Sequence, residues 1–410
     1  MSAPPRYAPE IRIAFDRVPA PAELRGSVTS VSCQTGLGGS DRLELSLVNE
    51  RLRWLDDPLL RLGAEISFAI GYAPDSPTQI FVGEVTGTEA AFPSDGVPTL
   101  RVVAQDRRTR LAESSPTRLF AVPIPGYGVQ PLPDLGVAPL IGLEHQLVTF
   151  VDPLAAFLSA ALSLADLDAT SEDPGGRQKL ARKQIGQSSL DFLGKIAAEN
   201  GWEVLMEHGP IAGGWVIRLM SPASVLAPEE TLRYGQSLID FTPRLSTVGQ
   251  VAAVSVKVWR PEIKLELTVT VGYDWEKRAL RIEITPGFLD KVAKGAKAGS
   301  ETKTLLVNEP VTVATAPRMI LSKLLPKLNR RLTASGSCVG TPTIAAGEVL
   351  RIEGVGEQFG GLYRVTQARH SFDGGGYRTS FDVRKEIWFD PIPLTAQGAV
   401  RLIPNPLPVA

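Results

Sequence analysis

The feature that most constrains the fold of this chain is a strict alternation of apolar and polar residues along several short segments. From Ile263 to Val271, every second residue is Ile, Leu or Val, and the residues between them are Lys, Glu or Thr. The same alternation runs through Leu43–Leu47, and Ile66–Ile70 places Ser and Ala between its apolar residues. A period of two directs successive side chains to opposite faces of a β-strand. We therefore expect strands with one buried face, in a mainly β chain.

Turn-forming residues separate these segments. Clusters of Gly, Pro, Asp and Ser lie at 36–39, 56–58, 73–77 and 93–96, and the chain of 410 residues holds 38 Gly and 33 Pro. Several short strands at this spacing favour a barrel or a sandwich. At roughly 100–200 residues per domain, a chain of this length predicts two to four domains.

The pattern divides the chain into five parts. We expect a first β part over residues 1–118, a Pro/Gly-rich loop that no helix crosses over 119–144, and an α+β part over 145–234. A second β part follows over 235–390, and a Pro-rich tail covers 391–410. The two β parts share no exact short repeat, but they could be related folds.

Two helices and a hairpin are predicted within the α+β part. Asp152-Pro153 starts the first helix, whose apolar face includes Phe157 and Leu158. Ser188 starts the second helix and Gly201 ends it. Residues 202–206 and 215–219 predict the hairpin. In the second β part, 290–300 is expected to be an exposed loop or short helix, and 317–332 a helix.

Composition excludes several classes of function. Lys and Arg number 43 and Asp and Glu number 44, so the chain is not a globally basic nucleic-acid binder. Two cysteines, Cys33 and Cys338, cannot build a disulfide framework or a four-cysteine zinc site, and three histidines leave little for metal chemistry. The N-terminus lacks the apolar region of a secretory signal, and no apolar run reaches the roughly 20 residues of a membrane span. We predict a protein made in the cytoplasm that does not insert into a membrane.

Three segments look like chemical motifs, and each lacks a required part. Gly354–Gly360 resembles a phosphate-binding loop, but its third glycine is one position late and a strand is expected after it. Gly336–Gly340 has the form of a nucleophile elbow around Cys338, but Pro342 follows where a helix is needed. Asp166-Leu-Asp168 opens like a calcium loop that lacks its central Gly and final Glu. We predict a turn, a buried cysteine and a helix end, respectively.

Two further groups of residues have a structural interpretation. His370 lies at an expected strand edge, where a structural hydrogen bond is favoured over catalysis. A basic stripe of Lys323, Lys327, Arg330 and Arg331 has no interleaved aromatic residues, so we interpret it as a solvated face or a contact with an acidic protein.

Three stretches of the chain, taken together, resemble a known family. The middle stretch runs from Ser189 to Trp202. The first stretch is marked by Asn49, Gly63, Gly71, Tyr72, Gly83, Glu84 and Asp106, and the last by Gly354, Gly356, Gly361, Tyr363, His370, Tyr377 and Phe381. In order and spacing they resemble the phage late control gene D proteins, which are baseplate hub proteins of contractile tails related to the hub part of VgrG in type VI secretion.

The resemblance implies two tube-forming β-barrel domains per chain and a homotrimer whose six barrels form a ring. Such a ring adapts a trimeric spike to a hexameric inner tube. The implied partners are the inner-tube protein, a separate spike protein and other baseplate proteins, with no specific nucleic acid. The implied location is the baseplate of a virion or phage-tail-like particle assembled in the cytoplasm. The implied role is structural rather than enzymatic, without catalytic, cofactor-binding or metal residues. Residues 123–140 and 290–304 depart from the family pattern and are interpreted as contacts with other baseplate parts.

Two alternatives stay open at this point. One is a cell-wall hydrolase or peptidase at a tail tip, which a Cys338–His370 pair within hydrogen-bond reach would support. The other is a monomeric β module that binds carbohydrate or protein, which a persistent monomer in solution would support.

Overall fold

The computed structural model describes residues 8–126, 128–169, 181–245, 253–260, 265–274, 279–286, 304–311, 325–389, 394–396 and 399–401. The first β part contains β1 (Ala8–Phe15), β2 (Val18–Pro19), α1 (Ala22–Ser27), β3 (Val28–Gly36), β4 (Arg42–Val48), β5 (Glu65–Ala73), β6 (Thr78–Ala91) and β7 (Thr99–Gln105), with short 3-10 turns at Glu50–Leu52 and Pro58–Leu60. The second contains β14 (Glu230–Arg233), β15 (Leu238–Leu245), β20 (Leu332–Val339), β21 (Val349–Glu353), α10 (Gly356–Phe359), β22 (Gly361–Asp373) and β23 (Gly376–Arg384).

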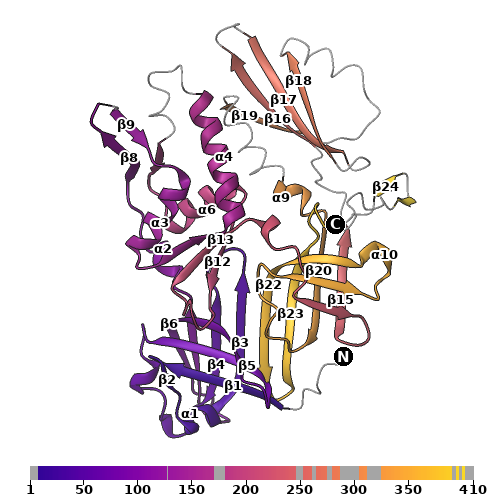
Figure 1. Ribbon diagram of the computed structural model, residues 1–410. Coiled ribbons are helices and arrows are strands. Elements are labelled where there is room, and N and C mark those ends of the chain that lie inside the picture. The colour runs from indigo at the N-terminus through magenta and orange to yellow at the C-terminus, as the bar shows by residue number, and fades with distance from the viewer. Residues whose placement is uncertain are drawn as a thin grey trace.

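The strands of both β parts form one 13-stranded sheet (Figure 1). Its main path has the order β15-β20-β23-β22-β3-β4-β7-β6-β5-β1-β2, with β21 beside β22 and β14 beside β21. The alternation seen in the sequence explains why these segments form strands with one buried face. In β4, for example, Leu43, Leu45 and Leu47 are buried and the residues between them point away from the core. The prediction of a mainly β chain with an α+β insert is confirmed.

The two β parts repeat the same five-stranded pattern. The first repeat has the antiparallel order β3-β4-β7-β6-β5, and the second has the antiparallel order β15-β20-β23-β22-β21. A bulge falls between Val85 and Gly87 where β6 meets β7, and the same bulge falls between Val365 and Gln367 where β22 meets β23. The two parts are therefore related folds.

A backbone detail supports the equivalence of the repeats. The Gly63 amide donates to the Val85 carbonyl at 2.8 Å, and the Gly347 amide donates to the Val365 carbonyl at 2.9 Å. Both glycines have positive φ, 80° and 93°, which glycine adopts without strain. Each repeat encloses its own core, around Leu45, Ile66 and Phe81 in the first repeat and around Leu350, Tyr363 and Phe381 in the second.

The residues between the two repeats, 109–229, are called the middle part here, and they form a three-stranded sheet with helices packed on it. The sheet has the order β10 (Val148–Val151), β13 (Val216–Met220) and β12 (Glu203–Glu207), and the helices are α2 (Thr109–Ala112), α3 (Asp134–Glu144), α4 (Pro153–Ala169) and α6 (Ser189–Asn200). The Ser188 hydroxyl accepts from the Asp191 amide at 3.0 Å, and Gly201 ends α6 with φ of 69°. The predicted hairpin and the predicted ends of α6 are confirmed.

The prediction of a loop that no helix crosses over 119–144 is wrong. The segment forms β8 (Arg118–Ile124), β9 (Gly128–Pro131) and then α3, with Pro139 inside the helix. β8 lies between β9 and β11 (Arg182–Gln184) in a small sheet. Pro139 removes one helical hydrogen bond, but Val137, Ala138 and Ile141 of the same helix are fully buried, and their burial offsets that loss.

The predicted apolar face of α4 is also wrong. Phe157 is 69% exposed and Leu158 is 40% exposed, whereas Ala155 and Ser159 are buried. Trp202 explains the choice of face, because its indole nitrogen donates to the Ala155 carbonyl at 3.2 Å and brings that side of α4 against the core.

A separate four-stranded sheet interrupts the second repeat. It consists of β16 (Ala253–Arg260), β17 (Leu265–Asp274), β18 (Ala279–Pro286) and β19 (Thr304–Val311), in the order β18-β17-β16-β19. The alternating run of 263–271 lies largely in β17, so a strand is present, but in this inserted sheet. The insertion occurs between β15 and β20, where the first repeat has the short turn 37–41 between β3 and β4.

Several predictions fall outside the described residues. These are the segment 290–300 and residues 317–324 of the helix expected at 317–332. The described half of that helix prediction is only partly right, because α9 (Leu325–Leu328) is followed by a turn and by the start of β20 at Leu332. In the tail, β24 (Leu394–Ala396) pairs with β25 (Ala399–Arg401). Within the described part of the chain, no helix has the length and apolar character needed to span a membrane.

Candidate functional site

The joint between the two repeats is a strand pairing. β22 runs antiparallel to β3 from Gln367 opposite Gly36 to Phe372 opposite Val31. Side chains reinforce the joint: Arg369 Nη2 donates to Gln34 Oε1 at 3.1 Å. The Ala346 amide also donates to Thr35 Oγ1, at 3.3 Å. This pairing makes one continuous sheet from the two repeats.

His370 lies buried at this joint. Its Nε2 lies 3.0 Å from the Ile344 carbonyl and therefore carries the proton, while its Nδ1 lies 2.8 Å from the Tyr377 hydroxyl. Burial lowers the pKa of His370 to about 4, so the ring is neutral at pH 7. Tyr377 extends into the core of the first repeat, where its ring centroid lies 5.7 Å from that of Tyr72. His370 thus has a structural environment.

The motif-like segments do not form the sites they resemble. Cys338 lies inside β20 and is fully buried, so the strand–turn–helix of a nucleophile elbow is absent at 336–340. The hydrogen bonds of His370 go to Tyr377, Thr379 and Ile344. Gly354 and Gly356 have positive φ in a turn that leads through the short α10 into β22. Asp166 and Asp168 lie in the last turns of α4.

The basic stripe does not form a solvated face along its whole length. Arg331 is 4% exposed, and burial lowers the pKa of its guanidinium to about 10. Lys323 lies outside the described residues.

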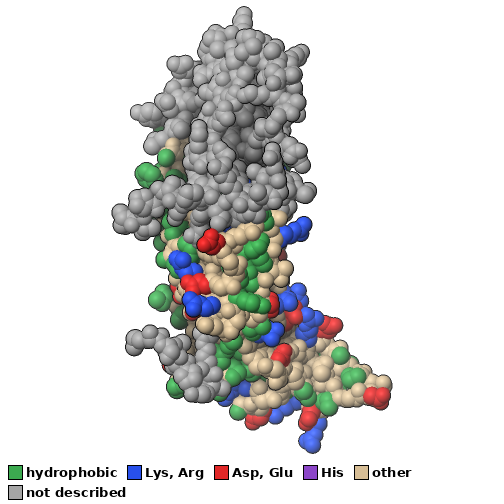
Figure 2. Space-filling view, turned by 90° about the vertical axis from the view of Figure 1, so that its right-hand side faces the viewer, with side chains coloured by type: hydrophobic (Ala, Val, Ile, Leu, Met, Phe, Trp, Pro, Cys, Tyr) green, Lys and Arg blue, Asp and Glu red, His purple; other side chains and the backbone are tan. Residues whose placement is uncertain are grey.

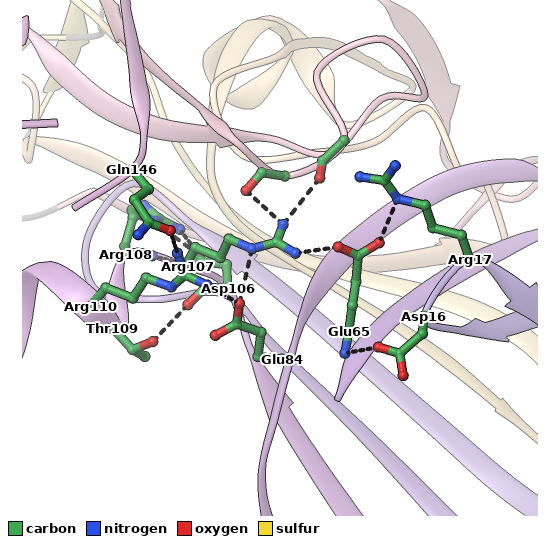
Figure 3. Close-up of polar contacts among 12 residues, drawn as sticks. Asp16, Arg17, Glu65, Glu84, Asp106, Arg107, Arg108, Thr109, Arg110 and Gln146 are labelled. Atoms are coloured by element: carbon green, nitrogen blue, oxygen red, sulfur yellow. Dashed lines mark hydrogen bonds and ion pairs between the residues drawn. The ribbon is translucent and has the colours of Figure 1, made fainter. Parts of the chain in front are cut away.

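Arg107 fixes the middle part to the first repeat (Figure 3). Its guanidinium contacts Glu84 at 3.1 Å and Glu65 at 2.5 Å. Its Nη1 donates to the carbonyls of Gly213 and Gly214, at 3.1 and 3.2 Å, in the turn between β12 and β13. The guanidinium also stacks 3.6 Å from the centre of the Trp215 ring. A buried arginine that is paired on both sides in this way holds two parts of the chain in one geometry.

A second buried cluster lies beside Arg107. Arg108 Nη2 lies 2.8 Å from Asp41 Oδ1 and 2.7 Å from Asp106 Oδ2. His208 of the middle part accepts from the Val82 amide through Nδ1, at 3.0 Å, and lies 2.8 Å from Asp41 through Nε2. Burial opposes ionisation of Asp41, but the charge of Arg108 and the hydrogen bond of His208 outweigh it and lower the pKa of Asp41.

This cluster has the residue types of a metal site. Asp41, Asp106 and His208 place their ligand atoms within 4.8 Å of one another, among the residues that the structure describes. The Arg108 guanidinium already contacts both carboxylates, so a metal ion bound by them would lie beside its positive charge and be repelled by it. The cluster is therefore suited to joining the first repeat to the middle part.

Arg364 makes the corresponding contact between the middle part and the second repeat. Its Nε donates to Glu386 at 3.0 Å, and both residues are fully buried. Its Nη2 donates to the carbonyls of Pro222 and Val225, which follow β13. Arg384 adds an ion pair to Glu203 of β12 at 2.5 Å. In each repeat, therefore, a buried arginine donates hydrogen bonds to backbone carbonyls of the middle part.

The residues that carried the family resemblance occupy structural positions. A Cβ on Gly83 would lie 2.2 Å from the Gln105 carbonyl oxygen, and one on Gly71 would lie 2.9 Å from Pro77 Cα. Asn49 accepts from the Trp54 amide at 2.8 Å. Glu84 and Asp106 belong to the arginine clusters, His370 and Tyr377 to the joint, Tyr72, Tyr363 and Phe381 to the cores, and Gly63, Gly354, Gly356 and Gly361 have positive φ. Their role as a family signature stays a prediction.

Sequence reasoning missed the arginines of these joints. Arg107, Arg108 and Arg364 are at most 1% exposed. One sequence feature could have indicated these buried arginines: the charged run Asp106-Arg107-Arg108 follows directly after an alternating strand, β7. The charged pair Lys385-Glu386 follows in the same way after β23, the last strand of the second repeat.

A shallow hollow lies on the polar face of the second repeat. Its volume is about 540 Å³, and its lining includes Asp240, Arg369, Arg378 and Asp382. On the side of the molecule where β15 and α10 lie, basic, acidic and hydrophobic side chains are interspersed (Figure 2). The described surface there carries no field of a single sign.

A family model described as "Alg8 N-terminal domain" matches residues 162–373, just over half of the chain. It is not the late control gene D family that the sequence resembles, so that resemblance stays a prediction. No curated protein matches the sequence.

Solved structures of tail proteins share the fold. The 43 kDa tail protein of prophage MuSo2 from Shewanella oneidensis superposes with a TM-score of 0.60 at 13% identity, over 93% of this chain and 100% of that one. A tail protein from Neisseria meningitidis MC58 gives a TM-score of 0.60 at 11% identity, over 93% and 98%. The E. coli c3393 protein, described as a type VI secretion component similar to T4 tail proteins gp27 and gp5, gives 0.53 at 12% identity, over 95% and 78%. At these identities the likeness shows the fold alone.

Proposed function

We propose that this chain, which belongs to the family described as Alg8 N-terminal domain, is the structural baseplate hub of a contractile phage tail or phage-tail-like injection system. In this role it adapts a trimeric spike to a hexameric inner tube. The fold it shares with two tail proteins over nearly their whole length supports this role.

The observation that carries the proposal is the internal repeat. One chain holds two copies of the same five-stranded unit, joined edge to edge by β22 and β3. Three chains would supply six such units in a ring with true threefold symmetry. Such a ring offers six similar surfaces to a hexameric tube and three identical ones to a spike.

The partners that follow are a homotrimer, an inner-tube protein, a separate spike protein and other baseplate proteins. The location that follows is the baseplate of a particle assembled in the cytoplasm. The near-balance of 43 basic and 44 acidic residues suits a passage that does not hold nucleic acid tightly. Signature residues such as Gly83 and His370 are proposed to maintain the repeats and their joint rather than to carry chemistry.

The proposal is tested by the mass of the purified full chain in solution. Light scattering at increasing protein concentration is expected to approach the mass of three chains, and negative-stain images are expected to show a ring with a central hole. A monomer at every concentration, without rings, would count against the hub and for a monomeric β module. The hydrolase alternative would gain support from cell-wall degradation that is lost in Cys338→Ala.

A further inference from the structure

We propose that a second copy of this chain adds its β15 to the far half of β6, residues Thr86–Ala91, and so repeats between chains the joint that β3 and β22 make within one chain. This inference rests on the proposed self-assembly and names the surfaces that carry it. The reason is a difference between equivalent strands: β22 and β3 pair with each other within the chain, whereas their equivalents β6 and β15 do not.

The first open edge is the far half of β6. β5 pairs with β6 from Thr78 to Glu84, and beyond Val85 the far half of β6 pairs with β7 alone among the described strands. The equivalent half of β22, from Gln367 to Phe372, pairs with β3. Exposure agrees with this difference, because Ala368 and His370 are buried whereas Thr88 is exposed and Ala90 is half-buried.

The second open edge belongs to β15. β15 pairs with β20 and ends the path of the sheet, whereas the equivalent β3 lies between β4 and β22. Among the strands that the structure describes, each chain therefore has one open edge of each kind. Inside the chain, the two equivalent edges are already joined once, by β22 and β3. A head-to-tail contact of this type links copies in series and closes when the rotation permits.

The shared bulge fixes the register of the proposed joint. Gln367 and Gly87 follow the bulge in their repeats, and Asp382 and Val103 lie opposite them. In the second repeat, Asp382 lies opposite Ser335 of β20, which lies opposite Thr242 of β15. In the first repeat, Val103 lies opposite Glu44 of β4, which lies opposite Ser32 of β3. Thr242 is therefore equivalent to Ser32. The resulting cross-chain pairs are Thr88 with Leu245, Glu89 with Arg244, Ala90 with Pro243, Ala91 with Thr242, and Phe92 with Phe241.

The side chains brought together by this register are complementary. Glu89 and Arg244 take the places of Arg369 and Gln34, which are hydrogen-bonded across the internal joint. Opposite charges on directly opposed residues stabilise a strand pair. Phe92, which is 60% exposed, would meet Phe241 at the edge of the core of the second repeat.

Pro243 makes this edge selective. Proline has no amide hydrogen, so the cross-chain ladder has one donor fewer than the ladder between β3 and β22. A proline on an edge strand discourages pairing with arbitrary strands. The remaining bonds, the Glu89–Arg244 pair and the Phe92 contact would favour β6 of a second copy over an unrelated strand.

Disulfide trapping tests the joint directly. Directly opposed residues of antiparallel strands have Cα atoms about 4.5–5.5 Å apart, within the range of a disulfide. The variant Glu89→Cys with Arg244→Cys is oxidised mildly in the full chain and examined by denaturing gel without reductant. We expect covalent dimers and trimers that reductant dissolves. The unaltered chain is the negative control. Its two cysteines, Cys33 and Cys338, are both buried, so we expect it to form no crosslink between chains.

Two matched variants control the geometry. Gln34→Cys with Arg369→Cys places the same pair at the internal joint and is expected to form a bond without a gain in mass. Glu89→Cys with Thr242→Cys is two residues out of register, where Cα atoms lie about 7–8 Å apart, and is expected to crosslink far less.

The outcomes separate this inference from the proposed function. If the internal pair forms but Glu89→Cys with Arg244→Cys gives no covalent oligomer, while light scattering shows a trimer, the joint is wrong and the hub stands. If the chain also stays monomeric at every concentration, both fail. Trapped open-ended multimers would support the joint and contradict the closed ring. Equal crosslinking in and out of register would contradict the proposed pairing.

Discussion

Glu84 and Arg364 occupy equivalent positions in the two repeats, carry opposite charges, and each forms an ion pair with a residue of the opposite sign. Glu84 pairs with Arg107 at 3.1 Å, and Arg364 pairs with Glu386 at 3.0 Å. Arg107 and Glu386 are equivalent in turn, since each follows the last strand of its repeat. The two repeats therefore keep an ion pair at the same two positions, with the acidic and basic residues exchanged. In both repeats the arginine of the pair also donates to carbonyls of the middle part.

Replacing Arg107 by Met is expected to destabilise the fold by about 3–5 kcal/mol, because it leaves Glu84 and Glu65 without their buried partner. Denaturant unfolding measures the change, and limited proteolysis should show earlier cleavage in the middle part. Arg12→Met is the matched control. Arg12 pairs with Glu10 on the surface, and its loss should cost well under about 1 kcal/mol. Equal losses in the two variants would contradict the role given to Arg107.

Exchanging the charges of the first pair should restore stability only in part. Arg107→Glu alone places three carboxylates together and should be the least stable variant. Adding Glu84→Arg re-forms an ion pair but does not supply donors to the carbonyls of Gly213 and Gly214. Unfolding midpoints of the single and double variants measure the recovery, and a double variant as stable as the original chain would show that the carbonyl contacts contribute nothing.

Gly83→Ala is expected to cost about 3 kcal/mol, because the new methyl group would lie 2.2 Å from the Gln105 carbonyl oxygen and the backbone must shift. Gly194→Ala is the control. It lies in α6 with no atom within 4 Å of the added carbon, so it should be neutral or stabilising by up to about 1 kcal/mol. Thermal unfolding of both variants distinguishes a steric effect from a general loss of glycine.

His370 predicts a dependence of stability on pH. Its pKa is about 4 in the folded chain, against an ordinary value near 6.5, because burial disfavours the charged ring. The unfolded chain therefore binds the proton more readily as the pH falls below 6.5. This contribution to stability is complete above pH 6.5 and is lost progressively towards pH 4, by about 3 kcal/mol in total.

The variant His370→Gln tests that dependence, since its amide can keep bonds to Ile344 and Tyr377 without titrating. Unfolding free energies of both proteins between pH 7 and 4 should diverge, with the flatter profile in the variant. Parallel profiles would show that His370 does not titrate on unfolding.

The sequence predicted those elements whose residues obey a local rule. Period-two alternation located β4 and β5, and the Ser188 cap with Gly201 located α6. The helix α3 was missed because Pro139 breaks the local rule, and burial of Ile141 outweighs the lost hydrogen bond.

The joints were missed for a different reason. Arg107 and Arg364 are charged, and charged residues are mostly exposed. Their burial depends on carbonyls more than 100 residues away along the chain, such as Gly213 and Val225. The run Asp106-Arg107-Arg108 after a strand can mark a candidate contact, but a single sequence does not say which distant carbonyls the arginine reaches. The repeat itself was hidden because its strands agree in order, bulge and turn geometry without sharing a run of identical residues.

We propose that three chains, each with two repeats, build a ring of six similar units. Electron cryomicroscopy of the assembled protein tests it most directly. We expect a closed ring with true threefold symmetry and six similar β units. Strand pairing is expected at all six joints, alternating between β22–β3 within chains and β6–β15 between chains. A ring whose chains meet through other surfaces would contradict the strand joint, and particles with a number of chains other than three would contradict the hub itself.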